Sequence, residues 1–165
     1  MGSCFEKGTM FLPQLMMSAE TVKNAFTAIK EYIEKSGIEQ ETRGRIVIAT
    51  VKGDIHDIGK NIVRVLLENY GYDVIDLGKD VDPEVVVETL RRENIKLCGL
   101  SALMTTTVLS MENTIKAIRE AGLDDVKVMV GGAVLTQEYA DMIGADFYGK
   151  DALASVNYAN SLFNK

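Results

Sequence analysis

The sequence predicts an α/β domain in which a parallel five-stranded sheet carries helices on both faces. From residue 45 onward, five short apolar runs alternate with helical stretches, which is the pattern of a doubly wound sheet. The first run, at 46–51, is nearly all apolar, as expected for a strand covered on both faces. A chain of 165 residues fits one domain with a short appendage.

The individual elements follow from apolar spacing and from residues that start or stop helices. We expect strands at 46–51, 74–77, 97–101, 126–130 and 146–148. We expect helices at 59–70, from Pro83 onward, and at 108–121, 137–142 and 151–163. Asp82 is the expected N-cap before Pro83, and a hydroxyl between 101 and 107 is expected to cap the following helix.

The N-terminal residues form a separate part of the prediction. Apolar side chains at helical spacing predict a helix at 18–36, with Ser18 as its N-cap and Gly37 as its stop. The polar residues at 38–44 indicate a linker. We therefore divide the chain into an N-terminal appendage at 1–43 and an α/β domain at 44–165.

Composition and charge argue against several classes of protein. The net charge of −6 disfavours a nucleic-acid partner, because phosphate binding needs a basic stripe. No apolar run approaches the roughly 18 residues of a membrane helix, and the start lacks a signal-peptide pattern, so we expect a cytoplasmic protein without membrane contact. Cys98 is the expected buried free thiol, and one histidine with two distant cysteines makes an ordinary protein-only zinc site unexpected.

A sheet of this size is expected to have the flavodoxin-like strand order 2-1-3-4-5. Ligands of such sheets bind at the carboxyl ends of the strands, next to the switch point between strands one and three. The loop after strand one holds Asp54 and His56, the sole histidine, between Gly53 and Gly59. Asp54 is placed to accept the second ring N–H of a metal-binding His56. The simpler alternatives are an acid near a helix N-terminus and a solvated loop histidine.

The loops after strands three and four lie at the same expected edge. Ser101 and Thr105 are candidates to bind a polar ligand, or else to cap the next helix. Gly131 and Gly132 mark either a simple turn or a place where a long ligand passes against bare backbone.

Three short motifs come in order at the ends of strands one, three and four: Asp54-x-His56-x-x-Gly59, Ser101-x-Leu103 and Gly131-Gly132. Together they resemble the three-part motif of Rossmann-like cobalamin-binding domains, over residues 44–165. The resemblance implies that the cofactor is cobalamin, a cobalt corrinoid. It also implies that His56 is the lower axial ligand of the cobalt, in place of the nucleotide base.

The resemblance assigns roles to further residues. It implies a catalytic His–Asp–hydroxyl relay of His56, Asp54 and Thr107, with threonine where related methionine synthases carry serine. It implies that the displaced nucleotide tail runs past Ser101 and Thr105. The implied cofactor-binding residues of the α/β domain are Gly53, Asp54, Ile55, His56, Asp57, Gly59, Ser101, Leu103, Thr105, Gly131, Gly132 and Ala152.

The N-terminal segment carries a second resemblance. Residues 11–19 are similar to the end of the helical cap that precedes such domains in methionine synthase and corrinoid carrier proteins. The resemblance implies that Phe5 and Leu12 cover the upper face of the corrin. For Phe5, simple packing on the following helix is an equal alternative. Because only the last piece of the cap is matched, we expect a cap remnant in a fragment of a longer protein.

The function implied by these resemblances is that of a methyl-carrying module, in which Co(I) accepts a methyl group and methyl-Co(III) releases it. We expect a methionine-synthase-type methyltransferase first, not active alone. Its implied partners are methyl-donor and methyl-acceptor domains or subunits and a reductive activation partner.

Other classes remain as alternatives. The nearest is a stand-alone corrinoid protein of a methylamine, methanol or methoxy-aromatic methyltransferase system. A cobalamin-dependent mutase shares the lower motif but not the segment at 11–19. A signalling receiver domain needs an aspartate at the end of strand three, where this chain has Ser101-Ala102-Leu103.

Overall fold

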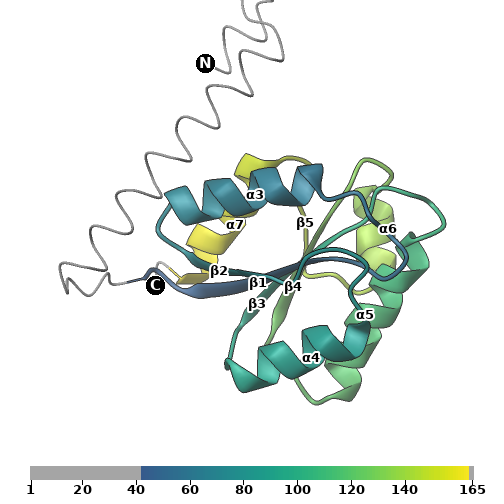
Figure 1. Ribbon diagram of the computed structural model, residues 1–165, viewed down its shortest axis with the longest axis horizontal. Coiled ribbons are helices and arrows are strands. Elements are labelled where there is room, and N and C mark those ends of the chain that lie inside the picture. Colours follow the sequence, from purple (N-terminus) through teal and green to yellow (C-terminus); the bar gives the residue numbers. More distant parts are fainter. Residues whose placement is uncertain (1–41, 164–165) are drawn as a thin grey trace, which may run out of the picture. The chain divides into compact units, whose positions relative to one another are not determined.

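The computed structural model describes residues 42–163, which form an α/β unit around a five-stranded sheet (Figure 1). The strand order is β2-β1-β3-β4-β5 and every pairing is parallel, which confirms the predicted doubly wound arrangement. The strands are β1 (Arg45–Thr50), β2 (Asp73–Asp76), β3 (Leu97–Ser101), β4 (Lys127–Gly131) and β5 (Phe147–Tyr148). The helix expected at 18–36 lies outside the described residues.

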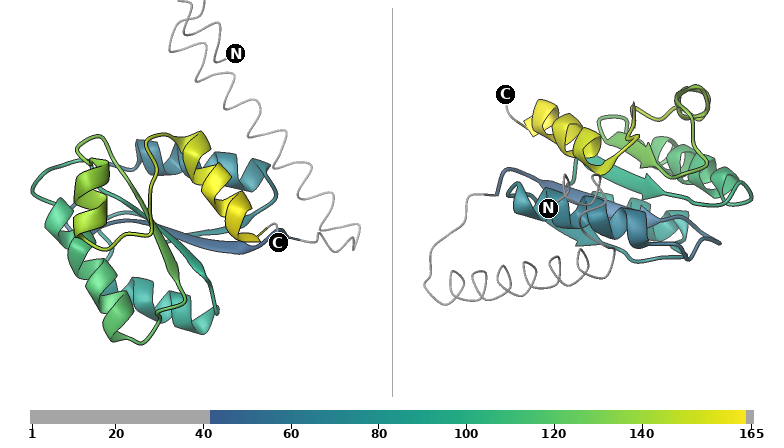
Figure 2. Two further views of the ribbon diagram at one scale, coloured as in Figure 1. Left: turned by 180° about the vertical axis from the view of Figure 1, so that it is seen from behind. Right: turned by 90° about the horizontal axis from the view of Figure 1, so that it is seen from above.

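Helices cover both faces of the sheet (Figures 1 and 2). The described helices are α3 (Ile58–Asn69), α4 (Pro83–Arg92), α5 (Val108–Glu120), α6 (Gln137–Met142) and α7 (Ala152–Phe163). Leu67 of α3 and Val156 of α7 share one buried cluster with strand residues. Side chains of α4, α5 and α6 form a second cluster against the opposite face.

Strand β1 is buried on both faces because successive strand side chains point in opposite directions. Ile46 and Ile48 pack in the cluster under α3 and α7, whereas Val47 and Ala49 pack in the cluster under α4 and α5. All four side chains are at most 2% exposed. The central strand therefore fixes the direction in which the following loop leaves the sheet, at the switch point between β1 and β3.

Several details differ from the sequence prediction. Val51 leaves the ladder and forms an isolated bridge with Val81 instead of extending β1. Asp82 occupies the N-cap position of α4, but its side chain accepts no hydrogen bond from the helix. Its carboxylate is held by Lys52 Nζ, 3.2 Å from Asp82 Oδ2, because the two loops lie side by side at this edge. The predicted capping role of Asp82 is therefore wrong for its side chain.

Two expectations from composition concern the described residues directly. Cys98 is a free, fully buried thiol in β3, as predicted, and burial raises its pKa to about 12. None of the helices within residues 42–163 has the length and apolarity needed to cross a membrane.

Candidate functional site

The loop after β1 turns sharply and buries a single carboxylate. Gly53 adopts a left-handed conformation with φ of 81°, which a glycine tolerates without steric cost. The turn is closed by the N–H of Asp54, which donates to the carbonyl of Val51 at 3.0 Å. As a result, the Asp54 side chain points inward and is completely buried.

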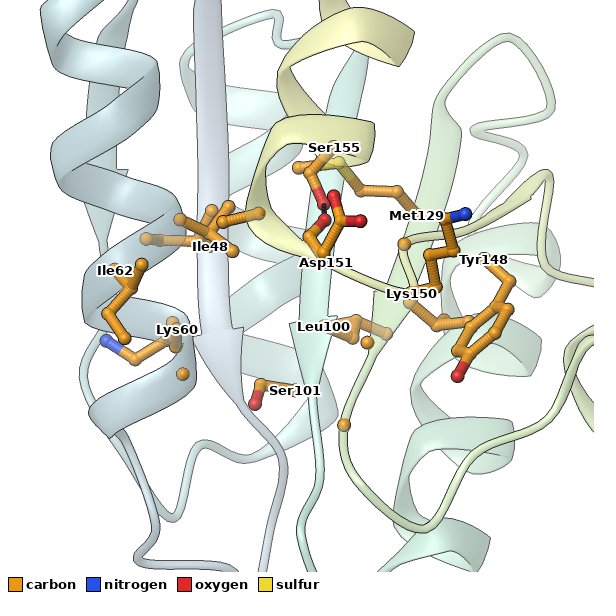
Figure 3. Close-up of a pocket in the computed structure, with 18 of the residues that line it drawn as sticks. Ile48, Lys60, Ile62, Leu100, Ser101, Met129, Tyr148, Lys150, Asp151 and Ser155 are labelled. Atoms are coloured by element: carbon orange, nitrogen blue, oxygen red, sulfur yellow. Dashed lines mark hydrogen bonds between the residues drawn. The ribbon is translucent and has the colours of Figure 1, made fainter. Parts of the chain in front are cut away.

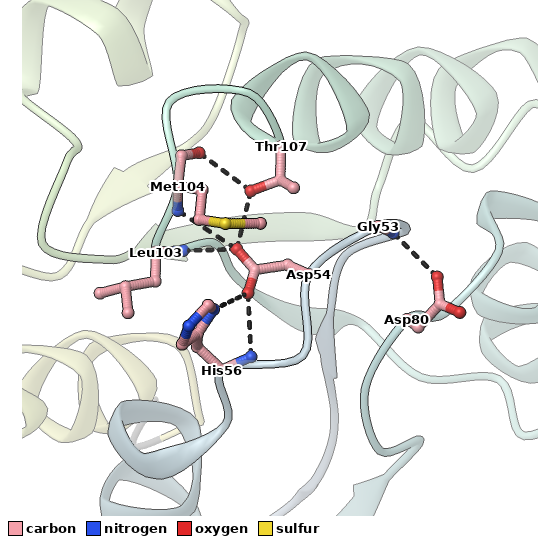
Figure 4. Close-up of polar contacts among 7 residues, drawn as sticks. All are labelled: Gly53, Asp54, His56, Asp80, Leu103, Met104 and Thr107. Carbon is pink, nitrogen blue, oxygen red and sulfur yellow. Dashed lines mark hydrogen bonds and ion pairs between the residues drawn. The ribbon is translucent and has the colours of Figure 1, made fainter.

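Five hydrogen bonds converge on the Asp54 carboxylate (Figure 4). Oδ1 accepts from the backbone N–H of His56 at 2.9 Å and lies 2.8 Å from His56 Nδ1. Oδ2 accepts from the backbone N–H of Leu103 at 2.7 Å, from that of Met104 at 3.3 Å and from Thr107 Oγ1 at 2.7 Å. The loops after β1 and β3 are therefore joined through one side chain.

The hydrogen bonds decide the charge of this buried group. Burial by itself raises the pKa of Asp54, because it disfavours the ionised form. The N–H groups of His56 and Leu103 and the hydroxyl of Thr107 outweigh burial and hold the pKa well below its usual range. Asp54 is therefore ionised at neutral pH and can act only as an acceptor.

The charge of Asp54 fixes the tautomer of His56. An ionised carboxylate accepts only, so the Nδ1 atom that faces it must carry a proton. The lone pair of the neutral imidazole then resides on Nε2. The His56 side chain is 44% exposed, although its partner is fully buried. The arrangement presents one basic nitrogen outward at the carboxyl edge of the sheet, suited to binding a metal.

Thr107 takes part in this network instead of capping a helix. It stands at the N-cap position of α5, but its side chain makes no capping bond, so the expected capping role is wrong. Its hydroxyl proton is shared between Asp54 Oδ2 and the carbonyl of Met104, which lies 2.9 Å away. Its methyl group faces Gly53, where an added Cβ would lie 3.6 Å from Thr107 Cγ2. Threonine is therefore accommodated without displacement.

The two loops joined by Asp54, and the start of α3, also carry exposed apolar side chains. Ile55, Ile58 and Leu103 are 63%, 78% and 40% exposed. Exposed apolar side chains beside a polar centre are typical of a ligand surface. Together with His56 they suit a broad, largely apolar ring system with a metal at its centre.

A cavity of about 490 Å³ opens next to this loop, between α3, α7 and the sheet (Figure 3). Its floor is made by Ile48, Gly99 and Met129, and Ser155 of α7 contributes a hydroxyl. Lys60 also lines it, but its ammonium is paired with Asp76. The cavity is thus mainly apolar with few polar groups, like most small-molecule sites.

Glycines make the cavity possible. A Cβ at Gly132 would lie only 1.8 Å from the carbonyl oxygen of Ala102, so no other residue fits there. A Cβ at Gly99 would meet Met129 Cε at 2.9 Å, and one at Gly149 would meet Ser155 Oγ at 2.5 Å. Backbone therefore stands where side chains would otherwise fill the space.

The structure brings most of the expected site residues to one edge. The expected residues that line the cavity, among others, are Gly59, Ser101, Gly131, Gly132 and Ala152. Thr105 is exposed and is not part of the lining. Asp57 is half-buried at the N-cap position of α3, without a side-chain capping bond. Phe5 and Leu12 lie outside the described residues.

Sequence reasoning missed the deep part of the cavity. Gly99 interrupts the apolar run of β3, and a glycine inside a strand is a known sign of close approach. Nothing comparable marks Met129 or Ser155 in the sequence. Met129 has the pattern of an ordinary core residue of a strand, and Ser155 that of an ordinary helix residue. The pairing of Lys60 with Asp76 was equally invisible.

This fold, with a histidine backed by a buried carboxylate beside a long apolar cavity, defines a class of cofactor-binding domain. Residues 44–157 match the family described as B12 binding domain, and residues 1–30 match a second family of the same description. The chain belongs to the B12-binding domain family, and its cofactor is cobalamin.

Known relatives specify the class further. The chain is 43% identical to dimethylamine corrinoid protein 3 of Methanosarcina mazei, over 98% of this chain and 96% of the relative. It resembles the crystal structure of a cobalamin-binding protein from Desulfitobacterium hafniense, with 33% identity, a TM-score of 0.75, and coverage of 97% of this chain and 75% of that one. It also resembles the methanol:cobalamin methyltransferase complex MtaBC of Methanosarcina barkeri, with 33% identity, a TM-score of 0.82, and coverage of 98% and 61%.

These relatives support a cobalamin methyl-carrier module of a methyltransferase system. They do not support the first expectation of a methionine-synthase-type protein. The alternative, a stand-alone corrinoid protein, fits them better. The motifs at the sheet edge did not separate the two, because the expected roles of His56, Asp54 and Thr107 are the same in both.

Proposed function

We propose that this chain is the stand-alone corrinoid subunit of a methyltransferase system that uses a methylamine or methanol as methyl donor. The observation that carries the proposal is the outward Nε2 of His56, fixed by Asp54 and lying next to a cavity shaped by glycines. Support for the donor class comes from the dimethylamine relative, which this chain matches over nearly the full length of both proteins.

The residues present suit the cofactor at both ends. The corrin-held cobalt supplies the centre that accepts and releases the methyl group. His56 would bind this metal through Nε2, and the exposed side chains of Ile55, Ile58 and Leu103 would contact the corrin ring. The cavity lined by Ser101, Gly131, Gly132 and Ala152 would hold the nucleotide tail.

Asp54 governs the proton on His56. While His56 is a ligand, Asp54 accepts the Nδ1 proton and increases the basicity of Nε2. The same carboxylate would hold that Nδ1 proton in place whether or not Nε2 is bound to the metal. Thr107 donates to Asp54 Oδ2 and keeps the carboxylate oriented. The three residues thus form the proposed relay.

The remaining parts of the proposal concern partners and the N-terminal region. Methyl donation and acceptance require separate methyltransferase subunits, and a reductive partner restores the cofactor after oxidation. We propose that residues 1–43 belong to a cap in which Phe5 and Leu12 cover the upper corrin face, ahead of a cobalamin-binding domain at 44–165. The system would work in the cytoplasm.

The test loads the purified chain with cobalamin, reduces it and offers different methyl-transferring partners. One set contains methyltransferase subunits for dimethylamine, trimethylamine or methanol, each with its substrate. The other contains methyltetrahydrofolate with the folate-binding module of a methionine synthase. We expect methylation, followed by the visible spectrum, only with the first set. Methylation only with the folate module would reject the stand-alone assignment.

A further inference from the structure

A second loop contacts the loop between β1 and α3 that carries His56, here called the histidine loop, at Gly53, away from His56 and Leu103 (Figure 4). It connects β2 to α4 and spans residues 77–82. The carbonyl of Gly78 accepts from the N–H of Thr50 at 3.0 Å, and the N–H of Val81 donates to the carbonyl of Thr50 at 3.1 Å. The end of β1 is therefore held in register just before the histidine loop begins.

Asp80 makes further hydrogen bonds to the histidine loop itself (Figure 4). Its Oδ1 accepts from the backbone N–H of Gly53 at 2.8 Å. Its own N–H donates to the carbonyl of Asp54 at 2.9 Å. The two bonds hold the peptide groups on either side of the Gly53–Asp54 peptide, and so limit how that peptide and the Asp54 side chain can turn.

The backbone of Asp80 is adapted to this task. Its φ is 55°, a left-handed value that Asp and Asn adopt more readily than most residues. Lys52 Nζ lies 3.4 Å from Asp80 Oδ1, so the carboxylate has a cationic neighbour as well as an N–H donor. The N–H of Gly53 and the ammonium of Lys52 both lower the pKa of Asp80. The carboxylate is therefore an ionised acceptor for Gly53.

Hydrogen bonds from the 77–82 loop are expected to have their largest effect at Gly53. This residue is exposed, has the conformational freedom of a glycine and directly precedes Asp54. Rotation about Gly53 would turn the Asp54 carboxylate away from Leu103 and Thr107, and His56 would follow through its bonds to Oδ1.

We propose that Asp80 is a positioning residue for the cobalt ligand: by fixing the peptide between Gly53 and Asp54, it holds His56 in the orientation that binds the metal. Asp80 touches neither His56 nor the cavity, so it acts through the loop. The inference rests on the proposed ligand role of His56. It adds a residue from the β2–α4 connection to a site otherwise built by the loops after β1 and β3.

The experiment compares three variants. Asp80→Gly removes the carboxylate but keeps the left-handed backbone and the N–H that binds Asp54. Asp80→Asn keeps an acceptor oxygen and is the expected rescue. Asp82→Ala is the matched control, because Asp82 also pairs with Lys52 and makes no hydrogen bond to Gly53 or Asp54 within residues 42–163.

The first readout uses cobalamin-loaded protein at an acidity where half of the wild-type cofactor is coordinated by His56, measured by the visible spectrum. We expect Asp80→Gly to lower the ratio of coordinated to free His56 about fivefold, as for loss of one exposed, charge-assisted hydrogen bond. Asp80→Asn should restore most of the ratio and Asp82→Ala should leave it unchanged. An unchanged ratio in Asp80→Gly overturns the inference.

The second readout uses the cofactor-free protein and separates this inference from the proposed function. Amide exchange at Gly53 and His56 should become about fivefold faster in Asp80→Gly. Exchange at Val128 and Val130, in the centre of the sheet, should stay at the wild-type rate. Equal acceleration everywhere indicates general destabilisation and overturns a positioning role. If the amides respond as expected but no His56 coordination is found in the wild type, the ligand role fails and Asp80 orders the loop only.

Discussion

In the proposed function, the Asp54 network and the adjoining cavity hold opposite ends of one cofactor by opposite means. At Asp54, five directional hydrogen bonds meet on a fully buried charge. In the cavity, walls are apolar and the decisive feature is missing side chains at Gly99, Gly132 and Gly149. Binding at the Asp54 network would depend on the orientation and charge of single groups, whereas binding in the cavity would depend on the shape of its walls.

The two regions therefore tolerate different substitutions. Removal of a buried carboxylate leaves its five donors without an acceptor. Each buried donor left in this way lowers the free energy of unfolding. A cavity made by glycine fails when a Cβ is added, but the cost depends on what the Cβ meets. A backbone atom cannot yield, whereas the end of a flexible side chain can.

The largest effect is expected at Gly132. Gly132→Ala places a Cβ 1.8 Å from the carbonyl oxygen of Ala102, and relieving this backbone clash should lower the free energy of unfolding by about 3 kcal/mol. Gly59→Ala is the control, since nothing lies within 4 Å of its Cβ, and it should raise stability by about 0.5 kcal/mol as a helix position. Urea unfolding of both variants checks the contrast. If Gly132→Ala unfolds at the same urea midpoint as the wild type, the backbone of the cavity wall can shift to accommodate the added Cβ.

Asp54→Asn comes second and addresses the polar end. The amide keeps the shape but turns an N–H₂ group towards donors, so we expect a loss of about 2 kcal/mol in the free energy of unfolding at pH 7. Because the folded-state pKa of Asp54 lies below its ordinary value of 3.8, its ionised form stabilises the fold above that pH.

The same variant should change the pH dependence of stability. In the wild type, the contribution of Asp54 is complete above about pH 4 and is lost as the pH falls towards the lower folded-state pKa. Asp54→Asn lacks this contribution, so its unfolding free energy should fall less steeply between about pH 4 and pH 2. Urea titrations at several pH values measure both slopes. Parallel curves would show that Asp54 is not the ionised centre of the network.

Thr107 tests the same network with a smaller change. Thr107→Val keeps the volume but removes the donor to Asp54 Oδ2, and about 1 kcal/mol of unfolding free energy should be lost. Thr107→Ser keeps the hydroxyl and should lose less, because only the methyl group beside Gly53 is gone. If the serine variant is the less stable of the two, packing and not the hydrogen bond is what Thr107 contributes.

The smallest loss of stability is expected for Gly99→Ala. This substitution should instead weaken binding of the cofactor. The Cβ of Gly99→Ala meets Met129 Cε, the end of a flexible side chain, so the unfolding free energy should change by less than about 1 kcal/mol. The raised cavity floor should weaken binding of cobalamin but not of cobinamide, which lacks the nucleotide tail. Equal weakening of both ligands would place the tail elsewhere.

Much of the fold could be predicted because its signals are local. The signals are the continuous apolar run of β1, Pro83 at the start of α4 and the glycines that follow helices, and each can be recognised from neighbouring residues. The pair of Asp54 and His56 could be expected for the same reason, since only one residue separates them. The resemblance to cobalamin-binding domains supplied Thr107, which lies 53 positions from Asp54.

The missed features depend on residues distant in sequence. The residues near Asp82 do not indicate that Lys52 would pair with its carboxylate. Likewise, those near Asp80 do not indicate a hydrogen bond to Gly53, which lies 27 positions away. The expected cap of α5 by a hydroxyl between 101 and 107 is not made at the N-cap residue, because Thr107 directs its hydroxyl to Asp54 Oδ2 and to the carbonyl of Met104. Such competition between partners is settled by tertiary structure alone.

The proposed function depends most on His56 Nε2 as the nitrogen that binds the cobalt. His56 is the sole histidine of the chain, so histidine labelled with nitrogen-15 marks this side chain alone. The measurement is the electron paramagnetic resonance spectrum of the cobalamin-loaded protein in its Co(II) state, with and without the label. We expect a nitrogen hyperfine splitting that changes with the label and disappears in His56→Ala, while cobalamin stays bound through its tail. A splitting that ignores the label would show that another nitrogen, such as that of the cofactor's own base, holds the metal.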